Sequence, residues 1–171
     1  MNRSFIAFTG VAAIGLISVL STRASDSAPL GTSAKADAHA RVTASVNRSQ
    51  LHRLAIQVDV NDAALMNLAL NNVSNTVQHY SEIGQKVEVE LVAFGPGLHM
   101  LREDTSPVKA RIKSMSETMP EVSFSACGNT RENMTKVEAK EIPLISQAKV
   151  TKSGVVRLME LQERGWSYLR P

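Results

Sequence analysis

The spacing of apolar residues from about Leu51 onward constrains the fold more than any other feature of this sequence. It changes repeatedly between the period of two, or the continuous apolar run, of a strand and the three- to four-residue period of a helix. This pattern predicts strands over 52–60, 86–94, 122–127 and 166–169. It predicts helices from Asn61 or Asp62 to Gly84, over 98–101, over 107–119, from Thr130 onward, and from Thr151 or Ser153 to Gly165. Residues 142–150 fit either a strand or a loop.

Strands that alternate with helices along a chain are typical of a parallel sheet with right-handed crossovers and helices on both faces. We therefore expect an α/β fold, a flavodoxin-like three-layer sandwich with a mainly parallel sheet of about five strands.

Several helix ends and faces can be predicted more closely. Ser106 is expected to cap a helix that has Pro107 at its first position, since the N–H that proline lacks has no partner there. The last helix is expected to bury an apolar side made of Val155, Val156, Leu158, Met159 and Leu161. Methionines at helical spacing are expected in the core, namely Met66, Met115, Met119, Met134 and Met159.

The first 24 residues have the features of an export signal. Arg3 supplies a positive charge, residues 5–20 are apolar and uncharged, and the segment 21–24 offers small residues for cleavage. We expect cleavage after Ala24 and a periplasmic or otherwise exported protein; the alternative is an anchor formed by an uncleaved N-terminal helix. Residues 25–48 have the composition of a disordered linker, which leaves one folded domain over 49–171.

Charge and cysteine content exclude some classes of function. The formal net charge is +3, and loss of Arg3 and Arg23 with the signal lowers it to +1. The basic residues are scattered and aromatic residues are few, so we expect no nucleic-acid partner, and no membrane partner after signal cleavage. The chain has a single cysteine and so cannot form an internal disulfide.

Three loops are expected to meet at the carboxyl edge of the sheet, where ligands of open α/β folds collect. They are 61–62, 95–97 and 127–130. Cys127 lies where a strand passes into a helix, and the free N–H groups at a helix start can hold a thiol as its thiolate. Cys127 is therefore the candidate catalytic residue. The candidate binding residues are Asn61, Gly95, Gly97, Gly128 and Asn129.

Cys127 has two interpretations, because free cysteine is also among the residues most often buried as a small apolar side chain. Arg131 and Lys136 would lower the pKa of the thiol if they faced it. His99 is the histidine best placed to form a nucleophilic pair with Cys127, although solvent exposure explains it equally well.

Other chemistry is not indicated by the sequence. The four histidines have no metal-ligand spacing, and we expect no metal and no other cofactor. The acidic residues Glu88, Glu90, Glu138 and Glu141 are expected on a solvated strand face and a solvated helix.

From about Leu51 to Pro171 the chain resembles the DsrE/DsrF-like proteins of bacterial sulfur metabolism. The likeness lies in the opening strand with Asn61-Asp62, in the runs 92–97 and 124–130, and in the ending, 153–156, 161–162 and 165–171. The resemblance implies a small α/β domain that assembles into trimers or hexamers. In sulfur-relay members a single cysteine carries sulfur as a persulfide, and Cys127 matches the position of that cysteine.

The resemblance implies a sulfur carrier or sulfurtransferase that uses Cys127, with sulfur donor and acceptor proteins as partners, and the N-terminal signal adds the expectation that it is exported. The chain differs from the relay proteins in its export signal and linker, so cytoplasmic relay partners would not meet it. Two alternatives stay open. One is a non-catalytic homo-oligomeric module that binds a small ligand or a partner with Cys127 packed in its core; the other is a redox-sensing thiol that forms intermolecular disulfides.

Overall fold

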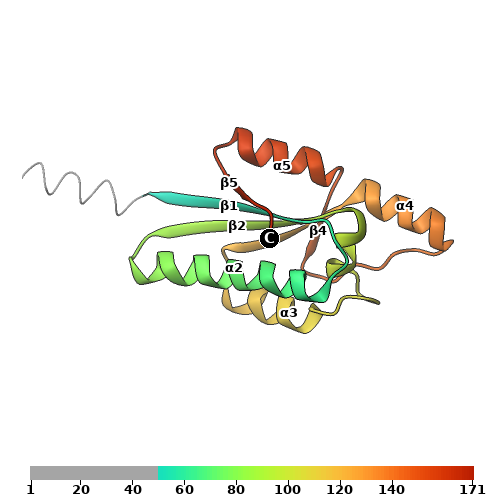
Figure 1. Ribbon diagram of the computed structural model, residues 1–171, viewed down its shortest axis with the longest axis horizontal. Coiled ribbons are helices and arrows are strands. Elements are labelled where there is room, and N and C mark those ends of the chain that lie inside the picture. Colours follow the sequence, from blue (N-terminus) through green and yellow to red (C-terminus); the bar gives the residue numbers. More distant parts are fainter. Residues whose placement is uncertain (1–49) are drawn as a thin grey trace, which may run out of the picture.

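The computed structural model describes residues 50–171, which form one sheet with helices around it (Figure 1). The elements are β1 (Leu51–Val58), α2 (Ala63–Glu82), β2 (Lys86–Ala93), the 3-10 helix η1 (Gly95–Leu101), α3 (Lys109–Thr118), β3 (Val122–Cys127), α4 (Gly128–Glu138), β4 (Ala148–Thr151), α5 (Gly154–Glu163) and β5 (Ser167–Leu169). The predicted signal peptide over 1–24 and linker over 25–48 lie outside the described residues.

All strand pairs are parallel, and the five strands follow the order β4-β3-β2-β1-β5. β1 and β2 pair along their whole length, from Leu51 opposite Lys86 to Val58 opposite Ala93. β2 lies at the centre and is buried from Val89 to Ala93, which explains its continuous apolar end. The predicted α/β, flavodoxin-like three-layer architecture is confirmed.

The helices cover the two faces of the sheet unequally (Figure 1). Helices α2 and α3 pack on one face and bury the main apolar core. On the other face α5 forms a small second cluster, in which Leu158 and Leu161 join Ala55 of β1 and Val92 of β2. Helix α4 buries none of its residues. On the α5 side, β3 and β4 therefore keep polar side chains next to an open hollow.

Two predicted boundaries on the first half of the domain are wrong. β1 ends at Val58, so Val60 is 41% exposed and not part of a buried strand. Helix α3 begins at Lys109, and Ser106 does not cap it. The Ser106 hydroxyl donates to the carbonyl of Met100 at 2.5 Å and accepts from the N–H of Val108, so the segment with Pro107 is a turn that joins η1 to α3.

The second half of the domain also differs in detail. Helix α4 begins at Gly128, two residues before the predicted start, because Cys127 and not a later residue caps it. Ser153 caps α5, with its Oγ accepting from the N–H of Val156 at 3.5 Å. Thr151 instead ends β4, which begins at Ala148 and so accounts for part of the segment that fitted strand or loop.

The apolar side predicted for the last helix is only partly buried. Leu158 and Leu161 are covered, but Val155, Val156 and Met159 are 53%, 49% and 54% exposed, because α5 rests on the sheet by a narrow stripe. Met159 is therefore not a core residue. Of the other methionines, Met66 and Met115 are buried, and Met119 and Met134 pack against the core.

Candidate functional site

The thiol of Cys127 lies at the carboxyl edge of the sheet, close to the starts of two helices. Cys127 ends β3 and caps α4, and its Sγ accepts a hydrogen bond from the N–H of Thr130 at 3.4 Å. Sulfur here takes the place of the side-chain oxygen that usually caps a helix. Cys127 also pairs with Thr151 at the end of β4, and α5 begins three residues later, at Gly154.

Thr130 connects the thiol to the glycine loop that follows β2. The N–H of Gly95 donates to Thr130 Oγ1 at 3.0 Å. Since this oxygen already accepts from Gly95, its own proton can be donated to the sulfur of Cys127. From the sequence, Thr130 was expected only as part of a turn and helix start; its hydroxyl links two of the three predicted loops.

Burial and hydrogen bonding act in opposite directions on the thiol. Burial raises the pKa of Cys127, because it disfavours the charged form. Hydrogen bonds from the Thr130 side chain and from the backbone N–H groups of Gly154, Thr130 and Asn129 lower it, and they outweigh burial. The pKa of Cys127 therefore lies below its ordinary value, and the negative charge of a thiolate would be met by donors from both α4 and α5.

Two glycines allow the backbone to pass closely at this edge. A Cβ on Gly97 would lie 2.2 Å from the carbonyl oxygen of Val58, and a Cβ on Gly154 would lie 2.9 Å from the Cβ of Phe94. No larger residue fits either place without moving the chain. Gly97 thus seats η1 against the end of β1, and Gly154 lets the start of α5 approach the strand ends.

The structure brings some of the predicted binding residues to Cys127 and leaves others apart. Gly128 and Asn129 form the first turn of α4, and the N–H of Asn129 donates to the carbonyl of Lys152 in the loop before α5. Gly95 reaches the site through Thr130. Asn61 lies exposed between β1 and α2, and within residues 50–171 no hydrogen bond joins its side chain to the thiol or to these loops.

The side chains predicted to activate the thiol, His99, Arg131 and Lys136, show no contact with Cys127 among the described hydrogen bonds. The Nδ1 of His99 forms a hydrogen bond with the Thr105 hydroxyl at 2.8 Å, so the described contacts give no His99–Cys127 pair. Arg131 binds the carbonyl of Ile142 and the carboxylate of Glu141. Neither Arg131 nor Lys136 is among the groups with the largest effects on the pKa of Cys127. Backbone and hydroxyl donors therefore take the place of the expected cations.

Glu90 was expected on a solvated strand face, and this prediction is wrong. Its side chain is 5% exposed and lies in a bidentate ion pair with Arg157 of α5, with N–O distances of 2.7 and 2.6 Å. The Ser125 hydroxyl donates to the same carboxylate at 2.6 Å. Burial raises the pKa of Glu90, but the hydrogen bonds from Arg157 and Ser125, together with the positive charge of Arg157, outweigh burial. The pKa of Glu90 therefore lies below its ordinary value, and the carboxylate stays ionised. The alternating pattern of the strand around Glu90 could not indicate Arg157, because this partner lies 67 positions further along the chain.

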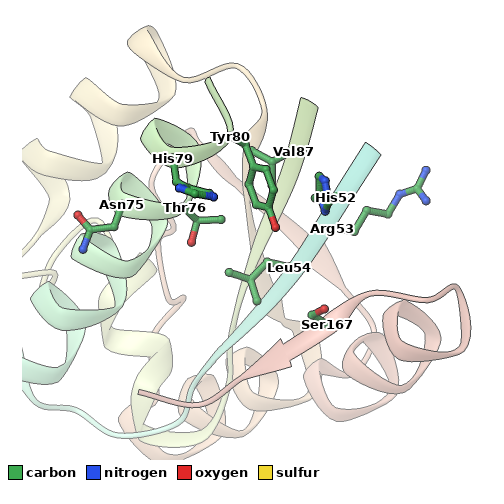
Figure 2. A pocket seen from close by; sticks show the side chains of 9 residues that line it. All are labelled: His52, Arg53, Leu54, Asn75, Thr76, His79, Tyr80, Val87 and Ser167. Carbon is green, nitrogen blue, oxygen red and sulfur yellow. The ribbon is translucent and has the colours of Figure 1, made fainter. Parts of the chain in front are cut away.

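A second cavity lies away from Cys127, at the amino end of β1, between β1 and α2 (Figure 2). It has a volume of about 420 Å³. The ring of His52 stacks on that of Tyr80 with centroids 4.0 Å apart, and His52 Nε2 lies 2.5 Å from Gln85 Oε1. Because Cys127 lies at the carboxyl ends of the strands, this cavity is not part of the predicted site.

Residues 50–171 contain neither a cluster suited to a metal ion nor a membrane-spanning helix. No group of three or more histidine, cysteine, aspartate or glutamate side chains there could hold a metal ion. In the same range, no helix has the length and apolar character needed to cross a membrane.

Comparison with known proteins supports the fold and gives no function. No protein-family profile matches the sequence. No curated protein matches it either. Among solved structures it is similar to MTH1491 from Methanobacterium thermoautotrophicum, itself described as a protein of unknown function. The two chains are 27% identical with a TM-score of 0.60, over 70% of this chain and 99% of MTH1491.

Proposed function

We propose that this chain is an exported DsrE-like protein that carries or transfers sulfur on Cys127. The observation that carries the proposal is the position of the thiol: it caps α4 and receives hydrogen bonds from Thr130 and from the start of α5, which favour the thiolate. A second support is the resemblance of the segment 124–130 to the cysteine segment of sulfur-relay proteins.

The chemistry is an exchange of sulfur–sulfur bonds. The Cys127 thiolate attacks the sulfane sulfur of a donor and forms a persulfide, while the donor leaves with the electron pair of its broken bond. An acceptor thiolate then takes the outer sulfur, and Cys127 leaves as the thiolate. The N–H groups of Thr130, Asn129 and Gly154 would stabilise the anionic sulfur during both steps.

The test is intact-mass analysis after incubation with polysulfide. The wild-type chain should gain the mass of sulfur, the gain should be removed by a reducing thiol, and Cys127→Ser should gain nothing. Lack of any gain in a folded wild-type protein would contradict the carrier function.

One observation favours a second candidate. Cys127 is only 5% exposed, as expected for a thiol that packs as a small apolar side chain. In that case the protein is a non-catalytic module that binds a small ligand or a partner at the same sheet edge. A thiol that resists alkylation at every pH in the folded protein would favour this module over the carrier.

We further propose a homo-oligomer, a trimer or hexamer by resemblance, in the periplasm or another exported location. The half-exposed Val155, Val156 and Met159 give α5 an apolar outer surface of the kind that subunit contacts cover. Light scattering of the purified chain, compared with a Val155→Lys variant, tests the assembly; a wild-type monomer would contradict it.

A further inference from the structure

A polar hollow of about 370 Å³ lies on the α5 side of the sheet. It exists because α5 packs over β1 and β2, while no residue of α4 is fully buried, so the side chains of β3 and β4 on this face stay uncovered. Ser123, Ser125, Lys149 and Thr151 line it from the strands, and Glu90 with Arg157 closes its inner side.

The charges in this hollow favour an anionic ligand. The carboxylate of Glu90 is neutralised in place, since it accepts two bonds from Arg157 and one from Ser125. Lys149 adds a positive charge, so the three ionised groups of the lining have a net charge of +1; Glu160, outside the lining, also pairs with Arg157, which makes Lys149 the main positive charge offered to a ligand. A guanidinium has five N–H donors; two of those on Arg157 are used on Glu90 and one on Glu160 of α5, at 3.4 Å, which leaves two for a ligand.

Two hydroxyl groups of the hollow, those of Ser123 and Ser125, already donate their protons within the protein. Ser125 donates its proton to Glu90, and Ser123 donates to the carbonyl of Val89 at 3.4 Å. The free donors of the hollow are therefore Lys149, Arg157 and Thr151. Several donors beside the positive charge of Lys149 suit a small oxyanion, whose oxygens accept from all sides.

The hollow adjoins Cys127. Side chains alternate along a strand, so Ser125 and Cys127 face the same side of the sheet at a spacing of roughly 7 Å. Thr151, at the rim of the hollow, pairs directly with Cys127. An oxyanion held between Lys149 and Thr151 would direct a sulfur attached to it towards the thiol.

We propose that this hollow binds the sulfonate end of a thiosulfate-type sulfur donor, with Lys149, Thr151 and Arg157 as its binding residues. The assignment rests on the proposed function for the use of Cys127. The Cys127 thiolate attacks the outer sulfur of thiosulfate, the sulfur–sulfur bond of the donor breaks, and sulfite leaves with its electron pair. One persulfide anion and one sulfite dianion form from one thiolate and one thiosulfate dianion, so atoms and charge balance.

The experiment separates binding from transfer. Thiosulfate is titrated into the full-length Cys127→Ser chain, or Cys127→Ala if the serine variant is unstable, and binding is followed by calorimetry. We expect saturable binding that sulfate and sulfite displace. Lys149→Gln should weaken it about tenfold, as for loss of one charge-assisted hydrogen bond. Lys113→Gln, an exposed lysine of α3 on the opposite face, is the matched control and should bind as the parent does.

Each outcome is informative. Absence of saturable binding, or equal binding by the Lys149→Gln and Lys113→Gln variants, overturns the oxyanion site. If such a protein still gains sulfur from polysulfide at Cys127, the carrier function stands without this site. If the site binds thiosulfate through Lys149 but the wild-type thiol never gains sulfur, the site stands and the carrier function fails.

Discussion

The guanidinium of Arg157 binds both carboxylate oxygens of Glu90, at 2.7 and 2.6 Å, although the two residues lie 67 positions apart. The pair fastens α5 to the central strand β2. It also lies one helical turn from Gly154, whose N–H helps to lower the pKa of Cys127. One ion pair therefore supports both the packing of α5 and the environment of the thiol.

Breaking this pair should destabilise the domain. We expect Glu90→Gln to lower the free energy of unfolding by about 3 kcal/mol, the low end for a buried pair, since Arg157 can partly reach solvent. The control is Arg53→Met, which breaks the exposed Arg53–Glu88 pair on the same face and should cost about 0.5 kcal/mol. Urea unfolding measures both variants, and equal losses would show that burial of the Glu90 pair is unimportant.

Stability should fall in acid. Burial raises the pKa of Glu90, but bonds from Arg157 and Ser125 hold it below its usual value. Hydrogen bonds from Arg102 likewise lower the pKa of Asp104 and of Glu138. At low pH the unfolded chain then binds more protons than the folded one. The stabilisation is present above the ordinary carboxyl pKa of about 4 and is lost as pH falls towards the folded values.

Arg102 provides the variant for this test. Its side chain is 1% exposed and binds Asp104 at 2.8 Å and Glu138 at 2.5 Å. Arg102→Met should be less stable at neutral pH and should lose less stability on acidification, because the pKa values of Asp104 and Glu138 lose their largest lowering effect and are then lowered by Lys140 alone. Urea unfolding at about pH 7 and about pH 3 compares it with the wild type; parallel losses would contradict the linkage.

The Thr130 hydroxyl should control the reactivity of the thiol. Burial raises the pKa of Cys127, and the hydrogen bond from the Thr130 side chain is the largest effect that lowers it. Thr130→Val should therefore shift the pH profile of alkylation to higher pH, and Thr130→Ser should restore it. A Thr130→Val profile identical to wild type would show that the hydroxyl does not reach the sulfur.

Gly97 should tolerate no side chain. Its Cβ would lie 2.2 Å from the carbonyl of Val58, so Gly97→Ala must move η1 away from β1, at a cost of about 3 kcal/mol or more. Gly128→Ala is the comparison, because its Cβ would lie 3.0 Å from the carbonyl of Thr151 and needs only a small shift. Thermal unfolding should rank Gly97→Ala well below Gly128→Ala.

Much of the fold could be predicted because its signals are local. β3 was predicted with the observed bounds, Val122–Cys127, since an apolar run ends there at a glycine. The helix expected to end at Gly84 ends at Glu82, and Gly84 follows its cap with φ +67°, a conformation that glycine adopts easily. The predicted roles of Ser106 and Val60 were wrong. The hydroxyl of Ser106 bonds to Met100 in η1, and Val60 is exposed because β1 ends before it; both depend on how these elements pack in the domain.

Apart from β4, the sequence by itself determined the alternation of strands and helices along the chain, the parallel α/β class, and the position of Cys127 at a strand end. It could do so because apolar period and turn residues act over a few positions. Only the tertiary structure decided what surrounds that thiol. The Thr130 hydroxyl connects the thiol to the loop of Gly95. The start of α5 lies near the thiol because the ion pair between Glu90 and Arg157 fixes that helix to β2. Such contacts arise where the strand order places distant segments side by side, and an apolar period carries no information about those distances.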